Sequence, residues 1–397
     1  MPLFPVVRHA RTAATAAVFC AAVASADTAH LPIADAHVHY SHDSVELTPP
    51  ARVIELMREA NLKFALVSSS DDRGTQLLSA LAPDLIVPGL RPYTRRGELS
   101  SWLTSETNLA YVEALLARNR YATIGEFHLY GSDAELPIPR RIVELAVEHN
   151  LVLHAHSDAD AVERLLAQDP TVKVLWAHAG FDEPEEIGAM LAKHDRLWAD
   201  LAFRGDVSYD GGLSEEWVTL FTTHPDRIML GTDTYTPERM YFLPSHAEAS
   251  RRWLSNLPAD VAERVAWRNA HELLMPHWDA NRADTAAEAV CEPYASEAPG
   301  VAVRAVEPIV VSQAFTAVVT VCHADLDITS VSLDARMPTH GHGMNYAPTH
   351  TVTQHTADTY EVQVDGVVLH MPGEWQWQVV VRSDGGRTRV TRDFSVN

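Results

Sequence analysis

Two histidines one residue apart close a short apolar run near the start of the chain, in Leu31-Pro-Ile-Ala-Asp-Ala-His-Val-His39. If the run is a β-strand, residues i and i+2 point to the same side, so His37 and His39 face one space with Asp35 below them. Imidazole nitrogens bind divalent transition metals, and two that converge from one strand form half of a metal site. The alternative is a pair of solvated or buried histidines that bind no metal. Whether the rest of the chain supplies further ligands distinguishes this alternative from a metal site.

Further histidines and carboxylates follow later apolar runs, each at the point where a strand should end. The contexts are Thr-Ile-Gly-Glu126, Leu-Val-Leu-His154-Ala-His156, Leu-Trp-Ala-His178 and Gly-Thr-Asp233. In a barrel of parallel strands the carboxyl ends lie on one face, and active sites are found there. Residue types that bind metals, repeated in register on different strands, favour a metal site over a set of unrelated polar residues.

The chain between Ile33 and about Met275 alternates short apolar runs with helical patterns such as Pro50–Ala60 and Glu215–His224. Eight such alternations predict a (β/α)₈ TIM-type barrel. The alternative, a doubly wound open sheet, is disfavoured because no glycine-rich fingerprint follows the first strand. The expected strands are Ile33–Tyr40, Phe64–Ser68, Leu85–Leu90, Thr123–Phe127, Leu151–His156, Val172–His178, Leu197–Ala202 and Arg227–Thr232.

Length and charge limit the class of protein. With 397 residues the chain is too long for one ordinary domain, so we expect two. Its formal net charge of −22 argues against nucleic acid or an anionic membrane surface as a partner. The expected partner is therefore a small-molecule substrate.

The first residues read as a secretory signal peptide, residues 1–26. Arg8 and Arg11 form a basic region, an apolar stretch of small residues follows, and Ala24-Ser25-Ala26 fits the rule for cleavage after Ala26. The apolar stretch is too short for a membrane-spanning helix, and no membrane anchor is expected. The mature protein is expected to be periplasmic or secreted, where a disulfide between Cys291 and Cys322 is permitted but not established.

The residues at the strand ends resemble the amidohydrolase superfamily, in its amidohydrolase-related or "amidohydrolase 2" branch, and TatD-type hydrolases at the fourth strand. The resemblance covers a domain at residues 27–275, and its most specific pieces are Asp35-Ala-His-Val-His39, Trp176-Ala-His178-Ala-Gly and Gly231-Thr-Asp233. It implies a hydrolase that holds one or two divalent metals, zinc being expected, with Asp233 taking a proton from the activated water. The implied ligands are His37, His39, Glu126, His156, His178 and Asp233.

Two positions need a choice within this resemblance. His156 matches the family's ligand spacing on the fifth strand, so His154, one layer deeper, is expected to support a ligand or to be buried with a partner. Many relatives carry a carboxylated lysine on the fourth strand, and this chain has none there. Glu126 either replaces that lysine as a ligand or orients one, and the sequence leaves both readings open.

Catalysis and substrate class follow as expectations. His178 would hold the metal or polarise a substrate oxygen. Arg91, Tyr93 and Arg204 also lie at strand ends, and a guanidinium can hold a carboxylate on two oxygens, so a carboxylate-bearing substrate is expected. Two alternatives stay open: a metal-dependent non-oxidative decarboxylase of an aromatic acid, and an exported metal-binding accessory protein without catalysis.

The last hundred residues differ in character from the barrel. Residues 276–300, rich in Ala, Glu, Asp and Pro, predict a linker, and residues 301–397 read as about seven short strands of an immunoglobulin-like sandwich. This part resembles YtkA-like domains, through Met371-Pro-Gly-Glu-Trp375 and Met337-Pro-Thr-His340-Gly-His342-Gly-Met344. Met337, His340, His342 and Met344 suit a copper site, because thioether and imidazole are copper ligands. The alternative is a loop shaped by its glycines.

Overall fold

A computed structural model describes residues 28–288, 300–306, 309–322, 327–338, 341–344, 346–355 and 359–396 of the protein. The predicted signal peptide, Cys291 and His340 lie outside these residues, as does the second half of the predicted linker.

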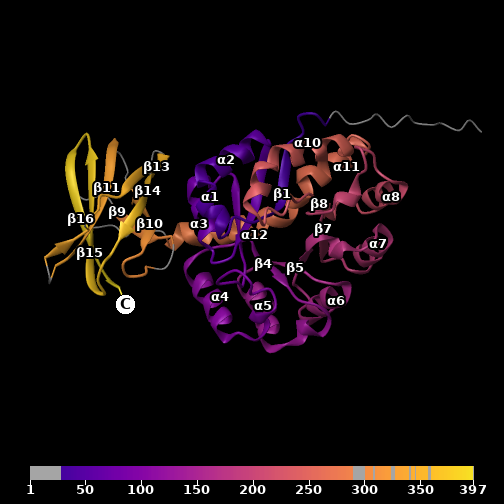
Figure 1. The fold of residues 1–397 in the computed structure, drawn as a ribbon, viewed down its shortest axis with the longest axis horizontal. Helices are drawn as coiled ribbons and strands as arrows, with labels where there is room; N and C mark the ends of the chain where they lie inside the picture. The colour runs from indigo at the N-terminus through magenta and orange to yellow at the C-terminus, as the bar shows by residue number, and fades with distance from the viewer. Residues whose placement is uncertain are drawn as a thin grey trace, which may run out of the picture.

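The first part of the described chain forms a parallel sheet of eight strands that neighbour each other in sequence order, wrapped into a barrel with helices on the outside (Figure 1). All eight strands expected from the sequence are present, which confirms the (β/α)₈ barrel. The strands are β1 (Ile33–Val38), β2 (Leu62–Ser69), β3 (Ile86–Leu90), β4 (Thr123–His128), β5 (Val152–His156), β6 (Val174–Trp176), β7 (Leu197–Asp200) and β8 (Ile228–Met229).

The seam between β8 and β1 closes the barrel and lies beside the first histidine pair. The backbone N–H of Asp233 donates to the carbonyl of His37 at 2.7 Å. The buried carboxylate of Asp35 accepts from the backbone N–H of Thr232 at 3.0 Å and from its hydroxyl at 2.6 Å. Burial raises the pKa of Asp35 to about 6 despite these bonds. Asp35 therefore fixes the end of β8 against the base of β1.

Helices surround the barrel and bury one face each against the strands. Helix α6 is an example: Asp158 caps its first turn by accepting from the N–H of Ala161 at 2.9 Å, and Val162, Leu165 and Leu166 on its inner face are buried. The outer helices are α1 (Asp43–Leu47), α2 (Pro50–Glu59), α3 (Arg73–Leu81), α4 (Glu106–Arg118), α5 (Pro137–Glu148), α6 (Ala159–Gln168), α7 (Pro184–Lys193), α8 (Glu215–Thr223), α9 (Pro237–Tyr241), α10 (Leu243–Leu254), α11 (Ala259–Glu263) and α12 (Asn269–Glu288). Short 3-10 turns are η1 (Ser101–Thr104), η2 (Gly131–Glu135), η3 (Ala177–Phe181) and η4 (Gly205–Val207), and η5 (Arg264–Arg268) is a π-helical turn.

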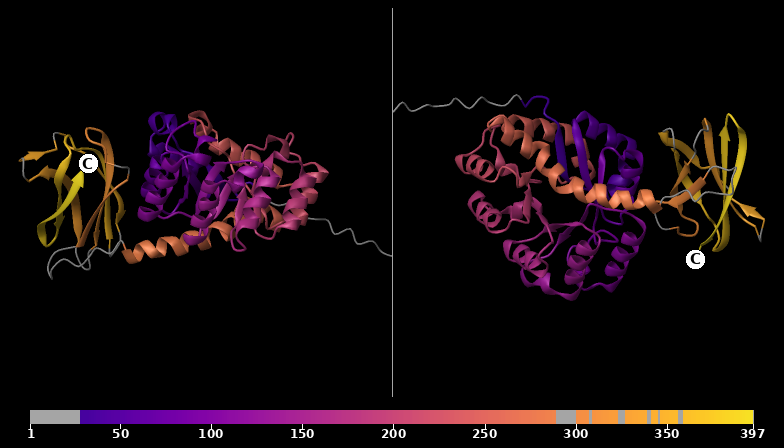
Figure 2. Two further views of the ribbon diagram at one scale, coloured as in Figure 1. Left: turned by 90° about the horizontal axis from the view of Figure 1, so that it is seen from below. Right: turned by 180° about the vertical axis from the view of Figure 1, so that it is seen from behind.

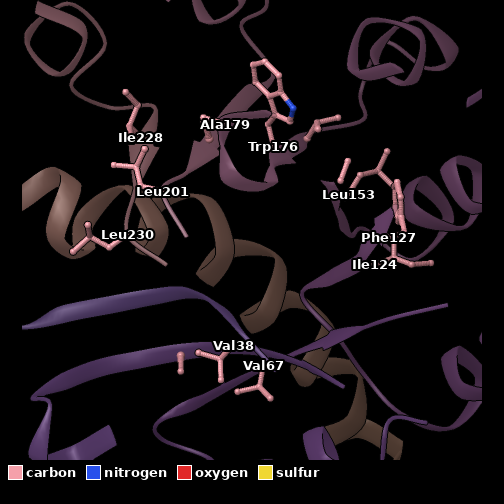
Figure 3. Close-up of a cluster of buried hydrophobic side chains, with 14 of the residues drawn as sticks. Val38, Val67, Ile124, Phe127, Leu153, Trp176, Ala179, Leu201, Ile228 and Leu230 are labelled. Carbon is pink, nitrogen blue, oxygen red and sulfur yellow. The ribbon is translucent and has the colours of Figure 1, made fainter. Parts of the chain in front are cut away.

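The main hydrophobic core of the barrel lies between the strands and the surrounding helices. Figure 3 shows part of it, with Phe127, Leu153 and Trp176 contributed by the strand region and fully or almost fully buried. This packing fixes the strand ends, because side chains that alternate along each strand must place their apolar members in the core. The polar members at the carboxyl ends are therefore held in a defined position.

The predicted linker begins later than expected. Residues 276–288 continue helix α12, which crosses the barrel on the side opposite the view in Figure 1 (Figure 2). His277 Nδ1 lies 2.8 Å from the carbonyl oxygen of Asn150, and the amide of Asn281 donates to the carbonyl of Tyr121 at 2.7 Å. The alanine-rich sequence has high helix propensity, and these polar contacts replace the apolar period whose absence suggested a linker.

The C-terminal part forms a sandwich of two antiparallel sheets, ordered β13-β14-β10-β9 and β12-β11-β15-β16. Seven of its strands match the seven expected from the sequence, and the short β12 was not expected. Their inner faces meet in one core that includes Phe315, Trp375 and Trp377. The strands are β9 (Gly300–Ala305), β10 (Ala314–Cys322), β11 (Ile328–Met337), β12 (His342–Gly343), β13 (Thr349–His355), β14 (Thr359–Val368), β15 (Gly373–Ser383) and β16 (Gly386–Val396).

The sandwich contacts the barrel near α3, where Leu77 and Ala80 form a small buried cluster with Val306 and Val318. Figures 1 and 2 both show the sandwich at this side of the barrel, at the end of α12. Among the described residues, no helix combines the length and the apolar character needed to cross a membrane.

Candidate metal centre of the barrel

Six of the residues predicted as ligands meet at the carboxyl ends of the strands. Nε2 of His37 and Nε2 of His39, both on β1, lie 3.1 Å apart. Oε2 of Glu126 on β4 lies 3.0 Å from Nε2 of His39, and Oδ1 of Asp233 after β8 lies 3.5 Å from the same atom. His156 on β5 and His178 after β6 complete the set through the other oxygen of Glu126.

Three imidazoles of this group are held so that a lone pair faces the centre. Nδ1 of His37 lies 3.2 Å from Oδ2 of Asp200, and Nδ1 of His39 lies 2.7 Å from the carbonyl oxygen of Ser68. In the same way, Nδ1 of His178 lies 2.7 Å from the carbonyl oxygen of Ala202. These oxygens only accept hydrogen bonds, so in the neutral imidazole the proton is on Nδ1 and the Nε2 atom keeps its lone pair.

The resulting arrangement fits a divalent cation. The Nε2 lone pairs of His37 and His39 approach each other at 3.1 Å, and Nε2 of His178 lies 3.4 Å from the carboxylate of Glu126. Acceptors that face each other at such distances repel unless positive charge lies between them. A cation with nitrogen and oxygen ligands satisfies all of them, and the oxygens on the Nδ1 atoms are the outer contacts that usually orient a metal-binding histidine.

Glu126 is the residue that joins the group. Its Oε2 lies 3.5 Å from Nε2 of His37 and 3.0 Å from Nε2 of His39. Its Oε1 lies 2.9 Å from Nδ1 of His156 and 3.4 Å from Nε2 of His178. The two oxygens therefore face two different pairs of histidines, which is the arrangement that a carboxylate between two ions requires.

The electrostatics of the centre favour positive charge. Burial would raise the pKa of Glu126, but the charge of His37 and hydrogen bonds from His156 and His178 hold it well below its usual range. Burial would lower the pKa of His37, but Asp200 and Glu126 raise it well above its usual value. Arg91 compensates part of this buried negative charge at Glu126, and a protonated imidazole or a metal ion can provide the rest.

Asp200, at the end of β7, was missed in the sequence and is a central part of the site. Its fully buried carboxylate accepts from the backbone N–H of His178 at 3.2 Å and lies 3.0 Å from Nε2 of His154 and 3.2 Å from Nδ1 of His37. Burial would raise its pKa, but the charge of His37 and the bonds from both histidines keep it well below the usual range. The signal was an aspartate at the end of an apolar strand, in Leu-Trp-Ala-Asp200, in register with the other ligands.

The two histidines of β5 have different surroundings. His156 is half-buried and lies at the centre, whereas His154 is fully buried one layer deeper and contacts Asp200. Burial and the charge of His37 lower the pKa of His154 to about 4, so its imidazole is neutral. His128, which the sequence did not single out, stacks on His156 with ring centroids 4.0 Å apart. Burial lowers its pKa to about 3.

Asp233 follows β8 with a left-handed backbone φ of 52°. Non-glycine residues are uncommon there and persist where the surroundings fix them. Arg239 supplies part of this fixation, because its guanidinium donates to the carbonyls of Asp233 and Thr232. Gly231 supplies another part: a Cβ at that position would lie 2.8 Å from Cβ of His37, so only glycine lets β8 approach β1 this closely.

A cleft of about 630 Å³ opens above the centre, and we call it the strand-end cleft. Arg91 lines it and is fixed to Glu126, with Nη2 donating to Oε2 at 2.9 Å and Nε to the backbone carbonyl at 3.1 Å. Tyr93 is buried beside it, and its hydroxyl accepts from the backbone N–H of His128 at 2.8 Å. The lining includes His39, Arg91, Tyr93, Arg95, Arg96, Glu126, His128, His156, His178, Asp233 and Tyr235.

Arg204, predicted to support the centre or to bind substrate, does not line the strand-end cleft and contacts the segment of His178. Its guanidinium donates to both carboxylate oxygens of Asp206, at 2.8 and 2.7 Å, and to the carbonyls of His178 at 3.1 Å and Asp182 at 2.9 Å. Its side chain is 3% exposed, and it borders a separate cavity of about 940 Å³ that the centre does not line. Arg204 therefore positions the segment that carries His178.

Comparison with known proteins assigns a family to part of the chain. Residues 114–275, which include β4 to β8 and all ligand candidates except those on β1, match the model of the family described as Amidohydrolase. No curated protein matches the chain.

Solved structures with some similarity are distant in sequence. An uncharacterized TIM-barrel protein from Bordetella bronchiseptica is 15% identical over 59% of this chain and 85% of its own length, with a TM-score of 0.43. A β-aspartyl dipeptidase from the thermophilic, keratin-degrading Fervidobacterium islandicum AW-1 is 13% identical over 56% of this chain and 65% of its own, with a TM-score of 0.39. The similarity to amidohydrolases at the level of a family model is thus confined to residues 114–275, the part of the barrel from β4 to β8.

Proposed function

We propose that this protein is an exported hydrolase that uses one or two divalent ions, zinc by preference, and Asp233 as general base on a small substrate with a carboxylate. One observation carries the metal part of this proposal. When the imidazoles are neutral, the Nε2 lone pairs of His37, His39 and His178 converge on the carboxylate of Glu126, so that only acceptors face one another. Nitrogen and oxygen ligands in this number suit zinc.

The residues have separate roles in the proposed reaction. An ion held by these ligands would supply Lewis acidity, lowering the pKa of a coordinated water from about 15.7 toward about 7. Asp233 is 9% exposed, and its Oδ1 lies 3.5 Å from Nε2 of His39, so its carboxylate borders both the ligands and the strand-end cleft. It is placed to accept the proton of the attacking water and to pass it to the leaving group.

The proposed substrate class follows from the charges around the strand-end cleft. Arg91, Arg95 and Arg96 line it, paired with Glu126, Glu98 and Asp43 respectively, and the side chains of Arg95 and Arg96 remain 81% and 63% exposed. Guanidinium groups bind carboxylates on two oxygens, and a narrow cleft concentrates their field. The acidic protein as a whole would repel an anion, so these arginines favour a carboxylate at this position in particular.

We expect Glu126→Gln to lower the metal content from two ions to one, or to weaken binding of the ions. The amide keeps the shape of the side chain but loses the charge that both histidine pairs face. Elemental analysis of purified protein after equilibration with zinc measures the change. Glu144→Gln, whose side chain is 62% exposed on α5, is the control. Unchanged stoichiometry and affinity in Glu126→Gln would leave this residue as an orienting group beside a single ion.

Export is proposed from the N-terminal sequence alone. Basic Arg8 and Arg11, the apolar stretch and the Ala24-Ser25-Ala26 motif support cleavage after Ala26. Expression in a Gram-negative host should give periplasmic protein whose N-terminal residue is Asp27. Replacing Ala24 and Ala26 by bulky residues should block this cleavage. Unprocessed protein in the cytoplasm of cells that express the unaltered sequence would contradict the proposal.

The hydrolase proposal is tested by a substrate screen on the zinc-loaded protein. Lactones, amides, phosphoesters and aromatic acids are supplied with and without a carboxylate, and both acid release and CO₂ release are measured. Hydrolysis that is lost on chelation and restored by zinc supports the proposal. Release of CO₂ from an aromatic acid without hydrolysis of any substrate would instead identify a decarboxylase.

A further inference from the structure

Two loops of the sandwich bring histidine and methionine side chains to one end of that domain. The first is the turn between β11 and β12, with Met337 at its start and His342 and Met344 at its end. The second is the connection between β14 and β15, which carries His370 and Met371. The sequence predicted copper ligands only on the first loop, whereas the Met371 motif of the second loop supported only the resemblance to YtkA-like domains.

Contacts between the two loops are direct. The imidazole rings of His342 and His370 have centroids 5.7 Å apart with an angle of 84° between their planes. A Cβ at position 373 would lie 3.0 Å from Cε of Met337, so the end of the Met337 side chain touches the loop that carries His370 and Met371. The loops are therefore parts of one cluster and are close enough for a shared ligand.

The cluster contains a polar atom that the fold does not satisfy. Nδ1 of His370 is buried and has no hydrogen-bond partner among the described residues. Burying such a group without a partner is unfavourable, so a ligand that binds this atom would be favoured. Trp375 does not supply the bond: its ring is edge-on to His370 at 5.5 Å, and its Nε1 donates to the carbonyl of Met371 at 2.9 Å.

The two loops that carry this imidazole pair also carry methionines. Met337 is 2% exposed in the core of the sandwich, and Met344 and Met371 are partly buried and pack against the same core. His342 is exposed, so the cluster has an open side toward solvent. Thioether sulfur with imidazole nitrogen is a soft ligand set, which suits Cu(I) and is unfavourable for magnesium or calcium.

We propose that this end of the sandwich is a Cu(I) site formed by His342, His370, Met344 and Met371, with Met337 beneath it. It is separate in fold and in ligand chemistry from the centre of the barrel, and it does not depend on the hydrolase function. Compared with the site expected from one loop, it spans two loops and requires His370 and Met371. The competing explanation is that the methionines only fill the end of the core.

The test measures Cu(I) retention by the full-length, zinc-loaded protein. Cu(I) is titrated without oxygen against bicinchoninate, whose coloured complex reports the copper that the protein does not hold. We expect one Cu(I) held per chain, with affinity lowered at least about tenfold in His342→Ala and in His370→Gln and lost in the double variant. Met344→Leu and Met371→Leu keep the side-chain volume, and each should also weaken binding.

Controls separate a site from nonspecific binding. His350→Gln changes a histidine on β13 that lies outside the cluster and should bind Cu(I) like the unaltered protein. X-ray absorption at the copper edge should show sulfur as well as nitrogen ligands. Retention of Cu(I) by the double histidine variant at unchanged affinity would overturn the proposal, as would failure of the unaltered protein to hold Cu(I). His342 is exposed, so its variant remains informative even if His370→Gln does not fold.

Discussion

Asp233→Asn is expected to keep most of the metal and to lose most of the turnover. The asparagine has nearly the same shape, and the backbone contacts that hold position 233, from Arg239 and to His37, do not involve the side chain. It cannot accept a proton at neutral pH. Removal of a general base typically lowers kcat by about 10²–10⁴-fold, and we expect a loss in this range once a substrate is identified.

A matched control is available on another loop of the barrel. Asp210 is exposed and has a left-handed φ of 50°, close to that of Asp233, but it is not part of the centre. Asp210→Asn should have unaltered kcat. This result would show that an Asp-to-Asn change at a residue with left-handed φ does not by itself lower the rate. A near-normal rate in Asp233→Asn with a normal metal content would show that this aspartate is structural.

The double substitution His37→Ala, His39→Ala is expected to remove the ion bound beside β1. Both Nε2 atoms lie within 3.5 Å of Oε2 of Glu126, so the double variant removes two proposed ligands and leaves Arg91 as the remaining partner of that oxygen. Losing one ligand or outer contact commonly weakens binding by about 10–100-fold, and losing two ligands should abolish binding at micromolar zinc. Elemental analysis of the full-length protein measures the loss.

The control for this variant replaces two histidines that lie on the surface of the barrel domain. His30→Ala, His271→Ala should leave the metal content unchanged, because both residues are exposed and neither belongs to a candidate metal-binding group. Hydrolytic activity should fall with the metal in the first variant and remain in the second. Equal metal content in the two double variants would show that His37 and His39 are not ligands.

The barrel and the meeting of most candidate ligands were predictable, because the two-residue period of a strand assigns each side chain to one face of the sheet. His37 and His39 lie two residues apart on β1, and the later candidates end apolar runs, so their meeting follows from the parallel topology alone. The resemblance to amidohydrolases added the proton transfer by Asp233, which spacing cannot supply. The family match at residues 114–275 supports the resemblance for the part of the barrel from β4 to β8.

The roles of Arg204 and Asp200 depend on contacts between distant parts of the chain, so the period of a strand could not predict them. Arg204 looked free to bind a substrate, but its partners are Asp206 and carbonyls of the segment around His178. Asp200 was overlooked because the expected strand ran past it to Ala202, which placed it in the interior of the strand. Asp200 contacts the backbone N–H of His178 and the imidazoles of His154 and His37. These partners come from other strands, so the contacts exist only once the barrel has closed.

The most direct test of the metal centre is an anomalous-scattering map from crystals of the zinc-loaded protein, recorded above and below the zinc edge. We predict a peak bounded by Nε2 of His37, Nε2 of His39 and Oε2 of Glu126, and a second on the side of Glu126 that faces His156 and His178 if the carboxylate bridges two ions. Absence of a peak among these atoms in crystals with zinc bound elsewhere would contradict the account.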